Sequence, residues 1–368
     1  MAKGTLLRRN GTPLGIFAAS RAAIFAVLFF ATRLPGAPPW QRFLTGWDGA
    51  WYLLIAKHGY PTSLVPAPGQ TDHAFFPLYP MMIRGVHALG GWSFESSAVA
   101  AALVSSAAAM VVIWLLVQRL CDTPTASRTV ALMSFFPWAF IFTMAYSEGL
   151  LLLLGAICLL ALLDEHWLIA GLAALVAGAT RPNGFVLALP CAWAALVAIH
   201  RKRAWRALLA PALAPLGILG FFSYLQLRTG DFLANLHARS RGWAYDGIGF
   251  FHHPAAGKAV SSYAAHPLVR LDRLASFTTM GLILIALVLM VVWRPPAIVW
   301  LYVVPVVALA LWFDTYVSMP RFTLTAFPLL VAVARPAKGP VFYALIGVSA
   351  ALMATLFIFT GSTLLLTP

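Results

Sequence analysis

The chain has 368 residues, of which 61% are hydrophobic and only 10% are charged, and its mean hydropathy is +0.85. Soluble domains have about 45–50% apolar and about 25% charged residues, so this composition excludes an ordinary soluble protein and predicts an all-α polytopic membrane protein. Three dispersed cysteines exclude a secreted disulfide scaffold. The formal charge of +14 is scattered between apolar runs. We therefore expect the basic residues to meet membrane lipids or phosphates, and we expect no nucleic-acid partner.

Apolar runs of about 20 residues are long enough to cross the hydrocarbon of a bilayer. Such runs, some of them shorter, predict eleven spans, at residues 14–32, 97–117, 126–143, 147–163, 167–180, 184–199, 207–227, 274–293, 297–313, 322–334 and 341–359. Basic residues precede the first span as in a signal peptide, but no small-x-small cleavage pattern follows, so we expect an uncleaved anchor. Arg21 lies within that span and is expected to face other helices or an aqueous cavity.

Short basic loops at residues 200–206 and 335–338 indicate the cytoplasmic side. With eleven spans, this orientation places most carboxylates and histidines outside. We expect a single integral membrane domain with two modules. The first, at residues 1–227, carries a catalytic loop at residues 34–96, and the second, at residues 228–368, carries an outer loop at residues 228–273.

The first outer loop is expected to carry two helices on the membrane surface. Asp48 is well placed as an N-cap, and Gly59 ends the amphipathic run that follows it. Residues 75–89 are nearly apolar enough for a span, but they contain two prolines, an arginine and a histidine. We therefore interpret them as an amphipathic helix at the outer interface.

Asp48 lies in the segment with the highest density of candidate functional residues, Gly46-Trp47-Asp48-Gly49-Ala50-Trp51-Tyr52. One interpretation is a helix cap within an interfacial aromatic belt. The other is a carboxylate held among aromatic groups at the bilayer surface, where it can act as a general base. His73 follows in the same loop, and a lone histidine is more often structural than catalytic.

Two tight turns carry the next polar signals. They are Tyr146-Ser147-Glu148-Gly149 and Thr180-Arg181-Pro182-Asn183-Gly184. Turn and capping chemistry explains each turn when it is taken alone. Their expected position on the same side as Asp48 favours a shared site, and a carboxylate near hydrocarbon needs partners or water.

The long outer loop at residues 228–273 combines basic and aromatic residues, which suit a lipid-linked phosphate; its basic residues are Arg239, Arg241, Lys258 and Arg270. Its histidines lack a metal-ligand spacing. No phosphate-cradling glycine loop or dinucleotide fingerprint occurs either. We expect no metal and no cofactor, and any activated group is expected to arrive on a membrane-borne carrier.

Several of these segments, in this order, resemble PIG-V-type mannosyltransferases. They are Trp47-Asp48-Gly49, Gly59-Tyr60, residues 74–80 (AFFPLYP), Ala145-Tyr146-Ser147-Glu148, Ala179-Thr180-Arg181-Pro182-Asn183-Gly184 and Pro320-Arg321-Phe322. Pro182 stands where a serine is common in the family, and the resemblance spans roughly residues 45 to 330.

The resemblance implies a bacterial member of the GT-C membrane glycosyltransferases, with two interfacial helices in the first outer loop. Such an enzyme takes mannose from a polyprenyl-phosphate-mannose donor and transfers it, with inversion, to a lipid-linked or glycolipid acceptor. Asp48 occupies the position of the base. The residues expected to bind substrate are Trp47, His73, Glu148, Arg181, Asn183 and Arg321. The active site is expected to face the outside of the bacterial cytoplasmic membrane.

Two other classes of function fit the same residues. A transporter or flippase would use the buried charges as a permeation path, although it predicts polar groups spread through the middle of the membrane. A non-catalytic subunit would present a lipid to a partner enzyme.

Overall fold

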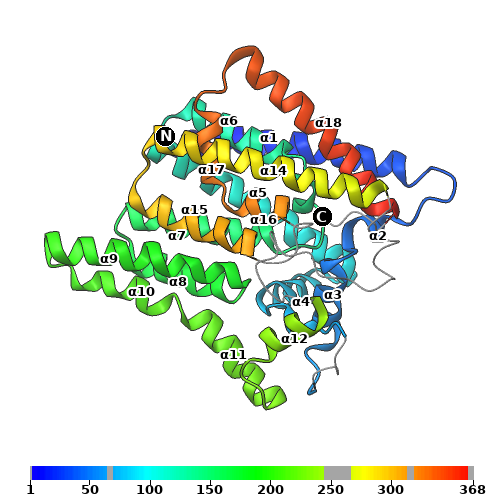
Figure 1. The fold of residues 1–368 in the computed structure, drawn as a ribbon, viewed down its shortest axis with the longest axis horizontal. Helices are drawn as coiled ribbons and strands as arrows, with labels where there is room; N and C mark the ends of the chain where they lie inside the picture. Colours follow the sequence, from blue (N-terminus) through cyan, green and yellow to red (C-terminus); the bar gives the residue numbers. More distant parts are fainter. Residues whose placement is uncertain (1, 64–68, 244–266, 313–318, 364–368) are drawn as a thin grey trace.

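The computed structural model describes residues 2–63, 69–243, 267–312 and 319–363, and these residues form helices and turns without a strand. The predicted all-α architecture is therefore confirmed for the described chain. Figure 1 shows a bundle in which α8 (Trp167–Gly178), α9 (Ala188–Lys202) and α10 (Leu209–Leu213) lie together at one end. The helices of the first loop gather at another edge.

Five helical segments are long and apolar enough to cross a membrane: Gly11–Ala31, Phe94–Leu120, Pro182–Lys202, Trp205–Thr229 and Gly339–Ser362. Four shorter apolar helices accompany them: Glu148–Leu163, Trp167–Gly178, Phe277–Trp293 and Ala297–Leu311. The protein is thus an integral membrane protein. The predicted count of eleven spans is not confirmed, and which side of the membrane each loop faces stays a prediction.

Two predicted spans are broken helices. The run at residues 126–143 forms α6 (Thr123–Phe135), which stops before Pro137, and continues as the short 3-10 helix η2 (Ala139–Phe142). The run at residues 322–334 forms α16 (Met319–Thr325) and α17 (Pro328–Ala334). The residue before a proline avoids the helical conformation, and Phe136 before Pro137 is extended, which explains the first break. Phe327 before Pro328 is helical, and the second break falls where Pro328 has no N–H to continue the helical hydrogen bonds. A count of apolar length alone takes no account of these prolines, so the sequence predicted two unbroken spans.

The first loop contains two helices close to those predicted. These are α3 (Asp48–His58) and α4 (Leu78–Gly90), and they are joined through the 3-10 turn η1 (Asp72–Ala74). Gly59 ends α3 as predicted, with φ of 76° and its N–H donated to the Ile55 carbonyl. The prediction of Asp48 as the N-cap is wrong by one residue. Trp47 holds the cap position, and Asp48 begins the helix with no capping hydrogen bond.

The centre of the bundle is the contact between α5 (Phe94–Leu120) and α7 (Glu148–Leu163). A Cβ added at Gly149 would lie 2.0 Å from Ser106 Oγ, so only glycine allows this approach. Small residues at a contact are the usual means of close helix packing in membranes. The contact holds the first turn of α7, and with it Glu148, inside the protein. The division into modules at residue 227 stays a prediction.

Arg21 lies inside α1 (Ala2–Ala31) and is buried, with 4% of its surface exposed. Its Nη1 donates to the Ala139 carbonyl at 2.7 Å and to the Thr143 hydroxyl at 2.8 Å, and its Nη2 donates to the Ser134 carbonyl at 2.8 Å. The prediction that Arg21 faces other helices is confirmed. The guanidinium ties the first helix to the break that follows α6.

Candidate active site

Asp48 begins α3 directly after a strained residue. Trp47 has φ of 57° and ψ of −127°, a conformation that bulky residues rarely adopt and that surrounding structure must enforce. A Cβ added at Gly49 would lie 3.2 Å from the Ala145 Cβ and 3.3 Å from the Ala145 carbonyl oxygen. The start of α3 therefore packs tightly against the Ala145–Glu148 turn, and the first two sequence motifs are neighbours in space.

A network of four charged side chains joins segments that are far apart in the sequence. Arg321 Nη1, from α16, donates to Asp48 Oδ2 at 2.8 Å, and Arg321 Nε lies 3.2 Å from Glu148 Oε1. Arg181 Nη1 donates to the same Glu148 oxygen at 2.7 Å. The Glu148 side chain is completely buried, whereas 24% of the Asp48 side chain is exposed. Glu148 thus has the cationic partners that a carboxylate near hydrocarbon needs. Asp48 is the most exposed of the four side chains.

Two hydroxyl groups extend this network, and sequence reasoning did not select either of them. Ser147 Oγ accepts a hydrogen bond from Arg181 Nη1 at 3.2 Å and shares one with the Tyr52 hydroxyl at 2.8 Å. Ser147 therefore makes no side-chain cap for α7. Burial raises the pKa of Tyr52 to about 12, so its hydroxyl stays protonated at neutral pH. The spacing of Tyr52 from Asp48, i to i+4 on one helix, was the signal that could have identified it.

Burial opposes the charge on Arg181, but Glu148, Tyr52 and Asp48 together outweigh that effect and hold the pKa of Arg181 above its usual range. Aromatic rings complete the surroundings of both guanidinium groups. Arg321 Cζ lies 5.1 Å from the centre of the Tyr146 ring and 4.9 Å from that of Phe322, and Arg181 Cζ lies 5.5 Å from the same Phe322 ring. Such cation–π contacts stabilise a desolvated cation.

Four buried polar atoms at this site lack a hydrogen-bond partner among the described residues: Trp47 Nε1, Tyr146 Oη, Glu148 Oε2 and Arg321 Nε. Buried polar atoms are nearly always paired, so a group of unpaired ones beside Asp48 is typical of a site that completes its hydrogen bonds with a ligand. Tyr146 belongs to a motif that the sequence singled out, but it was not predicted to bind substrate.

Apart from Trp47, which precedes Asp48 directly, two predicted substrate-binding residues lie outside the charged network. His73 is completely buried, and its two ring nitrogens are hydrogen-bonded to the Thr71 hydroxyl at 2.9 Å and the Pro61 carbonyl at 3.1 Å. Asn183 is buried in the 3-10 helix η3 (Pro182–Leu187), two residues after Arg181. Contact of these two residues with a substrate stays a prediction.

The long second loop is only partly described. Its first part forms α12 (Ala234–Trp243), where Asn235 donates to the His73 carbonyl at 2.7 Å and Arg239 Nη2 donates to the Ala74 carbonyl at 3.0 Å. This helix therefore holds the η1 turn of the first loop. The side chains of the other basic residues predicted to bind phosphate, Arg241, Lys258 and Arg270, lie outside the described residues.

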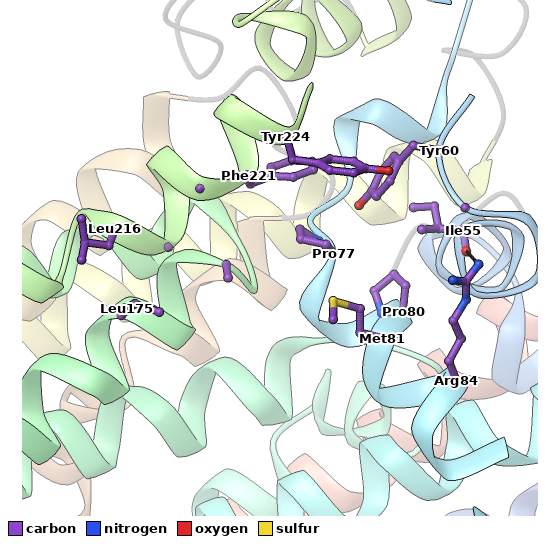
Figure 2. Close-up of a pocket in the computed structure, with 14 residues that line it drawn as sticks. Ile55, Tyr60, Pro77, Pro80, Met81, Arg84, Leu175, Leu216, Phe221 and Tyr224 are labelled. Atoms are coloured by element: carbon purple, nitrogen blue, oxygen red, sulfur yellow. Dashed lines mark hydrogen bonds between the residues drawn. The ribbon is translucent and has the colours of Figure 1, made fainter. Parts of the chain in front are cut away.

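An apolar groove of about 570 Å³ lies between the first-loop helices and the pair formed by α8 and α11 (Leu216–Thr229). In Figure 2 the rings of Tyr60, Phe221 and Tyr224 close one side of it, and Pro80 and Met81 of α4 line another. Arg84 is the charged residue in the lining, and its guanidinium is bonded to the Ile55 and Ala56 carbonyls at the end of α3. The groove thus begins on the same helix that carries Asp48.

Comparison with protein-family models gives no match, and comparison with curated proteins gives none. Among the solved structures that match is that of ArnT from Cupriavidus metallidurans bound to undecaprenyl phosphate. The match has a TM-score of 0.53 and 15% sequence identity, and it covers 94% of this chain and 65% of that chain. The chain has the fold of ArnT. That the chain is a GT-C glycosyltransferase stays a prediction. Membership of the PIG-V-type family stays a prediction.

Proposed function

We propose that this protein is a glycosyltransferase that moves mannose from a polyprenyl-phosphate-mannose donor to a lipid-linked or glycolipid acceptor. The observation that carries the proposal is the convergence of Asp48, Glu148, Arg181 and Arg321 in one ion-pair network. These residues come from four separate motifs of the sequence. The network places a partly exposed carboxylate beside two cations, which are the groups that transfer from a sugar phosphate needs.

The proposed reaction is a single displacement at C1 of the sugar. Asp48 accepts the proton of an acceptor hydroxyl as that oxygen forms a bond to C1. The bond from C1 to the phosphate oxygen breaks, and polyprenyl phosphate leaves with the electron pair. Because attack and departure occur on opposite faces of C1, a β-linked donor yields an α-mannoside. A general base of this kind contributes about 10²–10⁴-fold to the rate.

The two arginines are suited to the leaving phosphate. Negative charge grows on that group as the bond breaks, and fixed cations in a partly water-excluded site stabilise it. Arg321 Nη2 and Arg181 Nη2 have no hydrogen-bond partner among the described residues, so each guanidinium retains N–H donors for an anion. Glu148 keeps both cations in place without being exposed itself.

The apolar groove beside α3 supports a lipid-linked donor, because a prenyl chain is a long hydrocarbon with no hydrogen-bonding groups. Burying such a chain contributes roughly 25 cal/mol per Å² of apolar surface. The neighbour ArnT was solved bound to undecaprenyl phosphate, a carrier of this chemical class. We assign the groove to the prenyl chain of the donor. The active site is proposed to face the outside of a bacterial cytoplasmic membrane.

The decisive experiment is an assay of donor cleavage by the purified protein in lipid nanodiscs. Polyprenyl-phosphate-mannose with a radiolabelled sugar is supplied with a lipid extract as acceptor, and released polyprenyl phosphate and labelled glycolipid are measured. We expect transfer by the wild-type protein and, for Asp48→Asn, a loss of about 10²–10⁴-fold in a protein that still unfolds cooperatively. Asp164→Asn is the matched control, since Asp164 is an exposed partner of Arg119. It should retain full activity.

Each outcome separates the candidate functions. A transporter or a non-catalytic subunit would leave the donor intact, and transfer by a folded Asp48→Asn protein would remove Asp48 from the role of base. A parallel assay with polyprenyl-phosphate-glucose tests the sugar. Equal transfer of both sugars would contradict mannose specificity while leaving the glycosyltransferase proposal intact.

A further inference from the structure

We propose that Asp48 occupies the guanidinium of Arg321 that the donor phosphate requires, so that donor binding releases Asp48 to act as the base. This inference rests on the proposed function and adds to it an order in which the two substrates act. The donor must bind before the acceptor hydroxyl can be deprotonated. Asp48 would then have two states, one paired with Arg321 and one turned toward the acceptor.

The contacts of Arg321 are unequal, and this inequality decides which of them an entering anion replaces. Glu148 is completely buried, accepts a hydrogen bond from Arg181 and forms an ion pair with Arg321, so separating it from Arg321 would leave a buried carboxylate with fewer partners. Asp48 has 24% of its side chain exposed, and Arg321 is its one ion-pair partner among the residues with described positions. Its carboxylate can be solvated when that contact breaks. Asp48 is therefore the partner that leaves.

The shape of the guanidinium gives the second step of the argument. Arginine holds phosphate best through two parallel N–H donors, which makes the contact bidentate. Nη1 of Arg321 is committed to Asp48 Oδ2 at 2.8 Å, and Nε faces Glu148 Oε1 at 3.2 Å. Nε makes no hydrogen bond, but it is buried against Glu148 and is closed to an entering anion, and Nη2 makes no hydrogen bond with the residues that the structure describes. The bidentate contact open to a phosphate is therefore through Nη1 and Nη2, and it requires Asp48 to leave Nη1.

The charges of the network lead to the same conclusion. Two carboxylates and two guanidinium groups cancel formally, so a donor phosphate adds a negative charge to a site that is already balanced. The phosphate and Asp48 compete for one cation. Displacing Asp48 places the carboxylate next to the donor instead of on the cation, where the attacking hydroxyl needs it. The same exchange returns Asp48 to Arg321 once polyprenyl phosphate has left.

The test measures binding of undecaprenyl phosphate to the purified protein in nanodiscs. We expect Asp48→Asn to bind it about three- to tenfold more tightly than the wild type, because a neutral amide competes less for Arg321. Glu148→Gln is the matched control, since it removes the same charge from the same network but weakens the contact that holds both arginines, because an amide oxygen lacks the full negative charge of a carboxylate. It should bind the lipid more weakly than the wild type.

A structure of the wild-type protein with undecaprenyl phosphate provides an independent measurement, which does not depend on either variant folding. We expect the Asp48–Arg321 separation to exceed about 4 Å, the limit for an ion pair, while Glu148 stays on Arg321. Unchanged or weaker binding by Asp48→Asn would overturn the exchange. Equal tightening by both variants would also overturn it, because that result reports only net charge.

The proposed function can fail separately. If the wild-type protein neither binds undecaprenyl phosphate nor cleaves a mannosyl donor, the glycosyltransferase proposal is wrong and the exchange falls with it. If the wild type transfers mannose but Asp48→Asn shows no gain in affinity, only the exchange is wrong.

Discussion

Two buried arginines of this protein, Arg21 and Arg321, hold their charge in different ways. Arg21 donates to main-chain carbonyls of Ser134 and Ala139 and to a neutral hydroxyl, and each of its three nitrogens has a partner. Arg321 pairs with two carboxylates, and its Nε and Nη2 make no hydrogen bond in the described chain. The two residues are almost equally buried, with 4% and 5% of their surface exposed.

The difference separates a structural cation from one available for chemistry. The carbonyls that Arg21 binds lie at the end of α6 and in the turn after it, where backbone acceptors have lost their helical donors. A cation there also suits the negative end of the helix dipole. Arg321 instead joins side chains from α3 and α7 and keeps donor capacity unused. Burial of a charge in a membrane protein is therefore weaker evidence of function than an incomplete set of partners.

The largest effect on stability is expected from Glu148→Ala. This change leaves Arg181 and Arg321 without the oxygen they share, and breaking a buried ion pair on one side costs about 3–5 kcal/mol. Thermal unfolding of the purified protein in detergent measures the loss. Glu95→Ala is the control, because its pair with Lys57 is partly exposed, and such pairs contribute about 0–1 kcal/mol. Similar melting temperatures for the two variants would mean that the network contributes little to folding.

Arg21→Met should also destabilise the protein, by about 2–4 kcal/mol, since each buried acceptor left unpaired costs about 1–3 kcal/mol. Transfer per folded molecule should stay at the wild-type level. Thermal unfolding curves and transfer rates per folded molecule are compared with those of Arg33→Met. That control removes an exposed arginine. A stable but inactive Arg21→Met protein would break the distinction between the two arginines.

Arg321→Lys should lower kcat/KM for the donor by about 10–100-fold. One ammonium group cannot replace two separate nitrogens, and Arg321 uses Nη1 for Asp48 and Nε for Glu148. Arg181 makes both of its hydrogen bonds through Nη1 alone, so Arg181→Lys should cost only about threefold. Steady-state kinetics with varied donor measures both. A larger loss for Arg181→Lys would show that Arg181, and not Arg321, holds the phosphate.

The sequence predicted the helices well because apolar length and turn residues are local signals. The end of α3 at Gly59 is one example, and the helix in the nearly apolar run after Pro77 is another. The breaks after α6 and before Pro328 were missed because hydropathy was counted through the prolines. The need of Glu148 for partners was also predictable, because an isolated carboxylate near hydrocarbon is costly.

The partners themselves were harder to predict. Arg321 lies 273 residues from Asp48 in the sequence, and a local capping rule therefore assigned Asp48 to the helix terminus instead of to a distant cation. Tyr52 and Ser147 were missed for a related reason. Their importance comes from a hydrogen bond across 95 residues, which only the packing of α3 against the start of α7 creates.

An effect smaller than that of Arg321→Lys is expected in the apolar groove, from Gly220→Leu. A side chain at Gly220 meets nothing within 4 Å, so leucine should fill the groove without strain, and it also favours the helix. We expect KM for a long-chain donor to rise by about three- to tenfold, with little change for a donor whose chain is a short isoprenoid. Gly281→Leu adds the same side chain at a helical glycine with equal space outside the groove. If Gly220→Leu raises KM equally for both donors, the groove does not hold the prenyl chain.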